Sequence, residues 1–317
     1  MEIARGIHRL EAPLGDRRLA VHLCLGRYGV LFDTGTRQTP SEQVAPYLKR
    51  IHADPALVRL LVLTHSDADH HGGNAAAREL FPGALVAAHG EDRRLIEDRR
   101  AIFAERYNLG APMGVPQDEA VLSAIADMLG PDGPVDLELT GDERLDLGPG
   151  CEVQLMRVPG HTPGHVAGWV AKEGVLLAGD AVLGAGDRGR SGALEYPAAV
   201  LLPAAYRQTL AQIRALSPRV LLLAHLPVLE GADIVDYLDE SVGFVNAMQA
   251  AVSGALAVGR PMALPELIDR MLDAFRVYPQ AAKPGFVGPV LGTLRDFERQ
   301  GIAVRNGFSW SLAGDAR

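Results

Sequence analysis

The sequence predicts an α+β fold in which a larger part, rich in short strands, precedes a smaller helical part. Apolar runs of four to seven residues, typical of buried strands, alternate with helical patterns along residues 1–228. Residues 229–317 instead show three helical segments and a short hairpin. A chain of 317 residues is long enough for one large domain and one small domain. We therefore expect a domain boundary between residues 228 and 229.

The strand-rich part alternates regularly between strands and helices. We expect a helix to begin at Thr39, with Thr39 and Glu42 forming a capping box and Pro40 at the first helical position. Asn74 is expected to cap a later helix. The expected strands cover residues 22–25, 29–33, 57–63, 85–88, 135–139, 152–158, 167–171, 175–178 and 220–223, and the other helices cover 91–107, 118–129 and 204–216. The Gly- and Pro-rich residues 110–134 are expected to form a lid or one wall of a cleft, and residues 181–203 a long loop.

The helical part has the order of elements of a winged helix. Helices are expected over 234–258, 264–275 and 287–300, followed by two strands around the turn Asn306-Gly307. Residues 260–317 hold eight Lys or Arg and six Asp or Glu, and residues 226–259 hold five acids and no base. The basic residues of this part therefore form only a thin basic stripe. We expect a packing or dimerisation module rather than a nucleic-acid-binding module.

Composition argues against nucleic acid and membrane as general partners. The formal net charge is -8, which provides no general field for polyanions. We find no apolar run near the ~20 residues that a bilayer requires, and no signal peptide, so a cytoplasmic protein is expected. The two cysteines, Cys24 and Cys151, are expected to be free thiols.

Histidines and aspartates gather where strand-like runs end. The central segment, His65-Ser66-Asp67-Ala68-Asp69-His70, lies between an apolar strand and a Gly-Gly turn. Imidazole nitrogens and carboxylate oxygens are the ligands that first-row divalent ions accept. Six of the ten histidines fall in three clusters, which are His65, His70 and His71, then His161 and His165, then His225. The pattern predicts a metal site built from loops at the ends of strands.

These segments together resemble the metallo-β-lactamase superfamily, whose common metal motif is H-x-H-x-D-H. The segments that carry the resemblance are Thr64 to Gly73, Pro159 to His165, Leu177 to Asp180, and Leu223 to His225, with Asp33 in Phe32-Asp33-Thr34-Gly35 matching an aspartate beneath the metals. The resemblance implies a four-layer αββα sandwich in which two sheets face each other and the metals lie at one edge. It covers about residues 5–228.

The resemblance also implies a ligand set for two divalent ions. His65, Asp67 and His161 would hold one ion, Asp69, His70 and His225 the other, and Asp180 would bridge them. The chain departs from the common motif at Asp67, where the usual residue is His. The extra carboxylate makes manganese or iron an alternative to zinc, which is favoured. Two such ions can share and ionise one water, and Asp69 would orient the resulting hydroxide or relay its proton.

The substrate is less sharply indicated than the metal site. Arg188, Arg190 and Tyr196, in the loop after Asp180, are candidate contacts for a substrate carboxylate or phosphate. No lysine occurs between Lys172 and Lys283, which weighs against β-lactams, because β-lactam-hydrolysing members use a lysine in their substrate-binding loop. The first hypothesis is a small-molecule hydrolase acting on an ester, thioester or lactone. The alternatives are a phosphodiesterase or ribonuclease, a mononuclear iron enzyme, and a metal-stabilised DNA-binding regulator.

Overall fold

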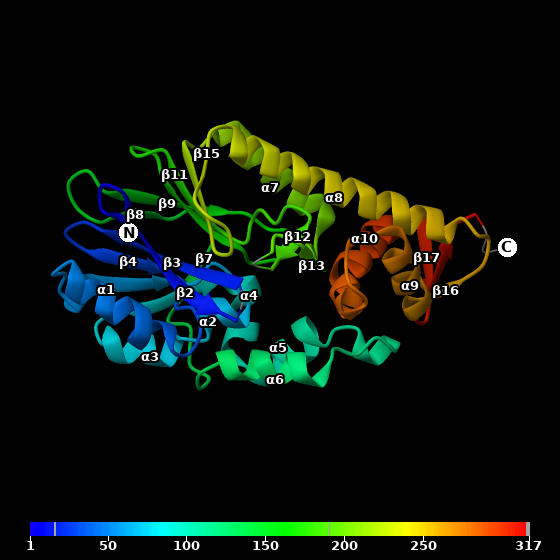
Figure 1. The fold of residues 1–317 in the computed structure, drawn as a ribbon, viewed down its shortest axis with the longest axis horizontal. Coiled ribbons are helices and arrows are strands. Elements are labelled where there is room, and N and C mark those ends of the chain that lie inside the picture. Colours follow the sequence, from blue (N-terminus) through cyan, green and yellow to red (C-terminus); the bar gives the residue numbers. More distant parts are fainter. Residues whose placement is uncertain (16, 190, 315–317) are drawn as a thin grey trace.

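Two facing β-sheets form the centre of the computed structural model, which describes residues 1–15, 17–189 and 191–314 (Figure 1). Within these residues the first sheet has seven strands in chain order. Its strands are β1 (Glu2–Ala4), β2 (Ile7–Leu14), β3 (Arg17–Leu25), β4 (Gly29–Phe32), β5 (Val58–Val62), β6 (Leu85–His89) and β7 (Leu137–Leu139). Pairing is antiparallel from β1 to β4 and parallel from β4 to β7. The parallel strands β4 to β6 therefore all end at the same edge of the sheet.

The second sheet has six strands within the described residues, in the order β15-β14-β11-β10-β9-β8. Its strands are β8 (Arg144–Asp146), β9 (Glu152–Arg157), β10 (Val166–Val170), β11 (Val175–Gly179), β14 (Val220–Leu223) and β15 (Leu229–Glu230). Strands β11 and β14 run parallel to each other. Their carboxyl ends, like those of β4 and β5, lead into the polar segments that the sequence analysis identified.

Helices cover the outer face of each sheet and complete a four-layer αββα sandwich, as expected. The first sheet is covered by α1 (Ala45–Arg50) with the preceding turn η1 (Pro40–Val44), by α3 (Asn74–Leu80) and by α4 (Gly90–Glu97), and the second by α7 (Pro203–Leu216). Strand β4 shows why both faces are buried. Its Val30 and Phe32 pack between the sheets, whereas Leu31 packs with the helices, because successive side chains of a strand point to opposite faces.

Residues 98–129 form a helical layer over the loop that follows β5. The elements are α5 (Arg99–Ile102), the π-helical turn η3 (Phe103–Tyr107), the 3-10 turn η4 (Ala111–Met113) and α6 (Glu119–Met128). Short helix α2 (Ala68–His71) contacts α6, and Ala68 packs with Ile102 and Leu129. Figure 1 shows α5 and α6 together below the sheets. A further 3-10 turn, η2 (Pro55–Leu57), leads into β5.

The C-terminal residues continue the apolar core of the second helical layer. Helix α8 (Ala232–Leu256) packs on α7 and leads to β16 (Met262–Ala263), α9 (Leu264–Ala274), η5 (Gln280–Phe286), α10 (Val287–Arg299), β17 (Ala303–Asn306) and β18 (Ser309–Leu312). One cluster of buried side chains extends from Leu176 and Leu221 of the second sheet through Leu238 of α8 to Leu294 of α10. The expected three helices and hairpin are present, and β16 adds a third strand to the hairpin. The boundary at residue 228 stays a prediction.

Several local predictions are wrong. Thr39 forms no capping box, because it is itself helical (φ −53°) and its Oγ1 accepts a hydrogen bond from the Thr36 N–H (3.0 Å). Asn74 is the first residue of α3 rather than its cap, and its Oδ1 accepts a hydrogen bond from Thr34 Oγ1. The single helix expected over 91–107 breaks at Asp98, whose extended backbone (φ −129°) and carboxylate cap α5 instead. Thus tertiary contacts and a side-chain cap override the local signals.

Part of the segment 181–203, which was expected to be a long loop, forms strands. It contains the antiparallel hairpin of β12 (Gly186–Arg188) and β13 (Leu194–Pro197).

Cys24 is buried and Cys151 half-buried, and both are free thiols, as expected. None of the helices in the described parts of the chain has the length and apolar character that a membrane crossing requires.

Candidate metal centre

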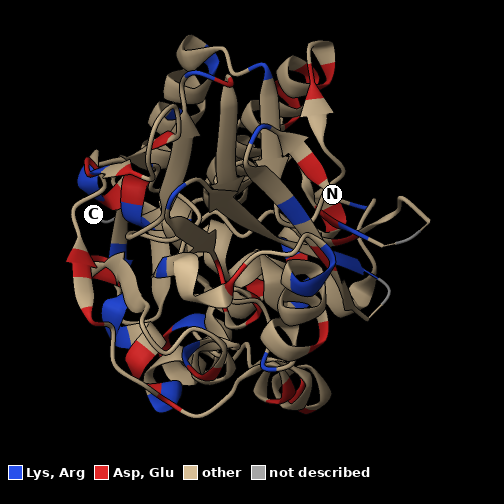
Figure 2. Ribbon diagram, turned by 90° about the vertical axis from the view of Figure 1, so that its left-hand side faces the viewer, with Lys and Arg blue, Asp and Glu red and all other residues tan. Residues whose placement is uncertain are grey.

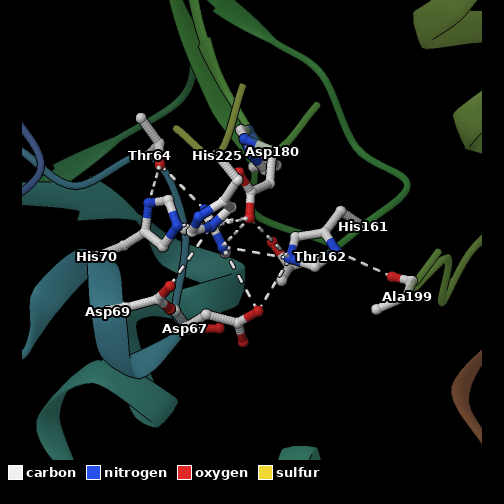
Figure 3. A network of polar contacts seen from close by, with 12 residues as sticks. Thr64, Asp67, Asp69, His70, His161, Thr162, Asp180, Ala199 and His225 are labelled. Carbon is white, nitrogen blue, oxygen red and sulfur yellow. Dashed lines mark hydrogen bonds and ion pairs between the residues drawn. The ribbon is translucent and has the colours of Figure 1, made fainter. Parts of the chain in front are cut away.

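Four loops bring the expected ligands to one edge of the sandwich (Figure 3). His65 and Asp67 follow β5, and Asp69 and His70 lie on α2. The other three ligands come from the loop after β9 (His161), the residue after β11 (Asp180) and the loop after β14 (His225). The segments after strand ends thus supply five of the seven expected ligands, which fixes their backbones without the help of an ion.

The first group of donor atoms comprises His65 Nε2, Asp67 Oδ2 and His161 Nε2. The His161 nitrogen lies 3.2 Å from the His65 nitrogen and 2.9 Å from the Asp67 oxygen. The His65 nitrogen and Asp67 oxygen are 3.6 Å apart. Such separations suit donors that surround one ion at about 2.0–2.2 Å from each.

The second group comprises Asp69, His70 and His225, with Asp180 between the groups. Asp69 Oδ2 lies 3.4 Å from His225 Nε2. Asp180 Oδ2 lies 3.4 Å from His70 Nε2 and 3.3 Å from His225 Nε2. The same oxygen is 3.9 Å from His65 Nε2 and 4.0 Å from His161 Nε2. One carboxylate oxygen therefore faces both groups, as a bridging ligand must.

The hydrogen bonds of the imidazoles fit bound divalent ions. His70 Nδ1 pairs with Asp33 Oδ2 (2.9 Å), and among the described residues its buried Nε2 has no hydrogen-bond partner. His161 Nδ1 pairs with the Ala199 carbonyl (2.9 Å), and His225 Nδ1 with the Arg18 carbonyl (3.0 Å). Because carbonyls only accept, these Nδ1 atoms carry protons, and the Nε2 atoms of both rings face the centre. The donor set therefore matches a divalent ion with nitrogen and oxygen ligands.

Charge in the centre is balanced between carboxylates and imidazoles. Burial alone would raise the pKa of Asp180, but the nearby positive charges of His225 and His70 outweigh it and hold that pKa well below its usual range. Burial alone would lower the pKa of His225, but Asp180 and Asp69 raise it to about 9.

Asp33 and Gly179 hold the ligand-bearing strands together beneath the centre. Asp33 accepts hydrogen bonds from the Thr64 N–H (2.7 Å) and Thr64 Oγ1 (2.9 Å) besides its contact with His70, as expected for an aspartate beneath the metals. Gly179 has a φ of +51°, and a Cβ there would lie 2.8 Å from Thr64 Oγ1. A side chain at Gly179 would therefore separate β11 from β5 and move Asp180 away from His65.

Turn η3 contributes two functional side chains that the sequence did not reveal. Arg106 donates from Nε to Asp67 Oδ1 (2.6 Å) and from Nη2 to Asp67 Oδ2 (2.7 Å). Its Nη2 also lies 3.1 Å from His161 Nε2. The Tyr107 hydroxyl accepts a hydrogen bond from the Ala68 N–H (2.6 Å). Both contacts hold the His65–His70 loop from the side of the 98–129 layer.

Asp92 ties together the two loops that carry the first group of ligands. It is 1% exposed and accepts hydrogen bonds from the Ser66 N–H (3.0 Å), the Gly164 N–H (2.8 Å) and the Thr162 hydroxyl (2.6 Å). No local signal in the sequence marks it, because Asp92 lies in the first turn of α4 and its three partners are 26 to 72 residues away.

Replacing Asp92 is expected to loosen both loops. Asp92→Ala leaves two buried N–H groups and one hydroxyl without their acceptor, so we expect the free energy of unfolding to fall by about 3 kcal/mol. Urea unfolding in a chelator measures this directly. Glu91→Ala, at the neighbouring position exposed on α4, is the control and should change stability little. Equal stability of the two variants would show that Asp92 does not hold the loops.

The remaining histidines support the site or the fold. His165 Nε2 accepts a hydrogen bond from the Asp180 N–H (3.1 Å), and its ring stacks on His65 with centroids 4.7 Å apart. Burial lowers the pKa of His165 to about 3 and that of His71 to about 4. His89 Nδ1 accepts a hydrogen bond from the Glu91 N–H at the start of α4. His165 thus holds the backbone of Asp180 in place.

A cavity of about 370 Å³ opens from the metal centre. Asp67, Asp69, His161, Asp180 and His225 line its polar end. This volume lies within the range of small-molecule sites. Five of the expected ligands therefore line one cavity.

The three candidate substrate contacts differ in their positions. Tyr196 lines the cavity. Arg188 does not line it, because its guanidinium pairs with Glu240 of α8. Arg190 lies outside the described residues.

Comparison with known proteins gives one family and a common fold. The family model described as the metallo-beta-lactamase superfamily matches residues 20–225. A hydroxyacylglutathione hydrolase of Dechloromonas aromatica is 28% identical over 142 residues. That match covers 45% of this chain and only 38% of the relative.

Two solved structures resemble the chain over nearly its whole length. A metallo-beta-lactamase family protein from Thermus thermophilus superposes with a TM-score of 0.72 at 23% identity, covering 98% of this chain and 99% of that one. A beta-lactamase domain protein from Burkholderia ambifaria gives a TM-score of 0.69 at 18% identity, covering 99% and 94%. The shared fold therefore includes the C-terminal helices.

Proposed function

Because the chain belongs to the metallo-beta-lactamase superfamily, we propose that it is a metal-dependent hydrolase of a small-molecule ester, thioester or lactone. The observation that carries this proposal is the placement of Asp180 Oδ2, which faces both ligand groups at the polar end of a cavity of about 370 Å³. Zinc is the favoured ion, and the carboxylate of Asp67 makes manganese or iron an alternative. The residues proposed as ligands are His65, Asp67, Asp69, His70, His161, Asp180 and His225.

The bound ions and the residues of the centre would have different roles in catalysis. Two bound divalent ions would supply an activated water and polarise the scissile carbonyl. Asp69, which lines the cavity beside His225, would orient the attacking water and accept its proton. Water adds to the acyl carbon, the acyl–oxygen or acyl–sulfur bond breaks, and a carboxylic acid and an alcohol or thiol leave.

The charges of the cavity favour an acyl substrate over a phosphodiester. The cations among the described lining residues are Arg17 and Arg106, and each is already paired, Arg17 with Asp187 (2.5 Å) and Arg106 with Asp67. Figure 2 shows Lys and Arg interleaved with Asp and Glu along the ribbon, without a continuous basic track in that view. A nucleic-acid backbone needs several unpaired cations. The name of the Dechloromonas relative also indicates a thioester as that protein's substrate.

Metal analysis combined with a substrate panel tests this function. We expect two equivalents of metal per chain, and hydrolysis of members of an ester, thioester and lactone panel that a chelator abolishes and added zinc or manganese restores. Bis-p-nitrophenyl phosphate and a β-lactam serve as the comparison substrates and should be cleaved far more slowly. Turnover of the phosphodiester alone would replace the acyl-hydrolase proposal with the phosphodiesterase alternative. Full activity after chelation would exclude a metal-dependent hydrolase.

A further inference from the structure

Apolar side chains make up much of the lining of the cavity beside the metal centre. Its remaining lining includes Leu109, Val121, Ile125, Leu201 and Val287. On the basis of the function proposed above, we propose that this end of the cavity binds the acyl group of the substrate, and that the group is an unbranched aliphatic chain of medium length.

Helix α6 contributes two apolar side chains to this wall. None of its residues is fully buried, although Val121 and Ile125 are apolar and half-buried. Both line the cavity. Apolar side chains left half-exposed along one cavity wall gain free energy when an apolar ligand removes them from water.

The opposite wall comes from the C-terminal residues and the β12–β13 hairpin. A Cβ on Gly285 would lie 3.0 Å from Pro197 Cδ, and one on Gly288 would lie 3.0 Å from Leu201 Cδ2. The end of η5 and the start of α10 are therefore packed closely against β13 and the segment that follows it. Buried Val287, which is 5% exposed, projects into the same wall. The C-terminal segment thus helps to enclose the apolar end and sets how long a chain can fit.

Charge places the acyl group, rather than the leaving group, at this end. Arg17 and Arg106, the described lining residues that carry positive charge, lie at the polar end and are paired. A polar thiol such as glutathione would lose its hydration in the apolar end without gaining ion pairs. An aliphatic chain has no polar groups that would lose hydration there. The carbonyl at the end of the chain would then lie at the metal centre.

A homologous substrate series tests the assignment on the whole protein with its metals. With p-nitrophenyl esters from acetate to decanoate, we expect kcat/KM to rise about fourfold per added methylene until the cavity is filled. Val121→Phe should shift the best substrate to a shorter chain. Val121→Asp should lower the ratio of octanoate-ester to acetate-ester kcat/KM at least tenfold. Ser123→Phe is the matched control, because Ser123 is exposed on α6 and is absent from the described lining, so it should leave the profile unchanged.

Two outcomes overturn the assignment. One is a kcat/KM that does not depend on acyl length, or that Val121→Phe and Val121→Asp leave unaltered. The other is a dependence on the chain length of the alcohol, measured with acetate esters of ethanol to octanol, in place of the acyl chain.

A binding measurement separates this inference from the proposed function. Titration calorimetry with octanoate, and with acetate as the reference, needs no turnover. If no ester is cleaved but octanoate binds at least tenfold more tightly than acetate and Val121→Asp removes the difference, the hydrolase proposal fails and the chain-binding cavity stands. If esters are cleaved but octanoate and acetate bind alike and no chain-length preference appears, the cavity assignment fails and the hydrolase proposal stands.

Discussion

Asp180→Asn is expected to lower hydrolysis by about 10³-fold and to reduce the bound metal at both groups. The substitution keeps the shape of the side chain but removes the negative charge that lies 3.3 to 4.0 Å from four imidazole nitrogens. Loss of about 4 kcal/mol of transition-state stabilisation corresponds to this factor. The measurements are metal content after gel filtration and kcat/KM with the best substrate of the panel.

Asp187→Asn is the matched control for metal content. Asp187 lines the same cavity but pairs with Arg17 rather than with an imidazole, so this variant should keep its metal. Loss of metal from only one group in Asp180→Asn would show that Asp180 does not bridge. Unchanged hydrolysis would exclude a mechanism that depends on both groups.

The sequence was sufficient for the layers of the fold and for the proposed metal ligands. Strands β5, β11 and β14 are short apolar runs, and their polar ends carry His65, Asp180 and His225, so pattern and chemistry coincide at the same positions. The parallel pairing of β4 with β5 and of β11 with β14 then brings these ends to one edge. That convergence follows from topology, which the family resemblance supplied.

The residues that hold the ligands in place could not be predicted in the same way. Asp92 and Arg106 lie on helical segments without any motif, and each acts through partners at least 26 residues away. An arginine on a charged helix is typical of a solvated surface, whereas Arg106 lies in turn η3, beyond the break at Asp98, and pairs with buried Asp67. One signal was available: an aspartate at position 67 in place of the usual histidine introduces a buried negative charge that needs a partner.

The pairing of Arg106 with Asp67 is expected to be the strongest stability determinant of the centre. The two side chains are 7% and 13% exposed. Burial alone would raise the pKa of Asp67, but the charge and hydrogen bonds of Arg106 outweigh it and hold that pKa well below its usual range. Removing one member of a buried ion pair leaves the other charge without compensation, at about 3–5 kcal/mol. We therefore expect Arg106→Met to lower the free energy of unfolding by that amount in the presence of a chelator.

A double substitution distinguishes this coupling from a simple loss of packing. Asp67→His alone restores the common H-x-H-x-D-H motif but leaves the Arg106 guanidinium buried beside an imidazole, so it should also be strongly destabilising. The double variant, Arg106→Met with Asp67→His, leaves no buried charge without a partner. It should therefore regain at least half of the stability that each single variant loses. Urea unfolding of the four proteins in a chelator, which removes the contribution of bound metal, gives the coupling energy. If the two losses simply add, Arg106 is not the partner that allows aspartate to replace histidine at position 67, and the departure from the common motif must have another physical cause.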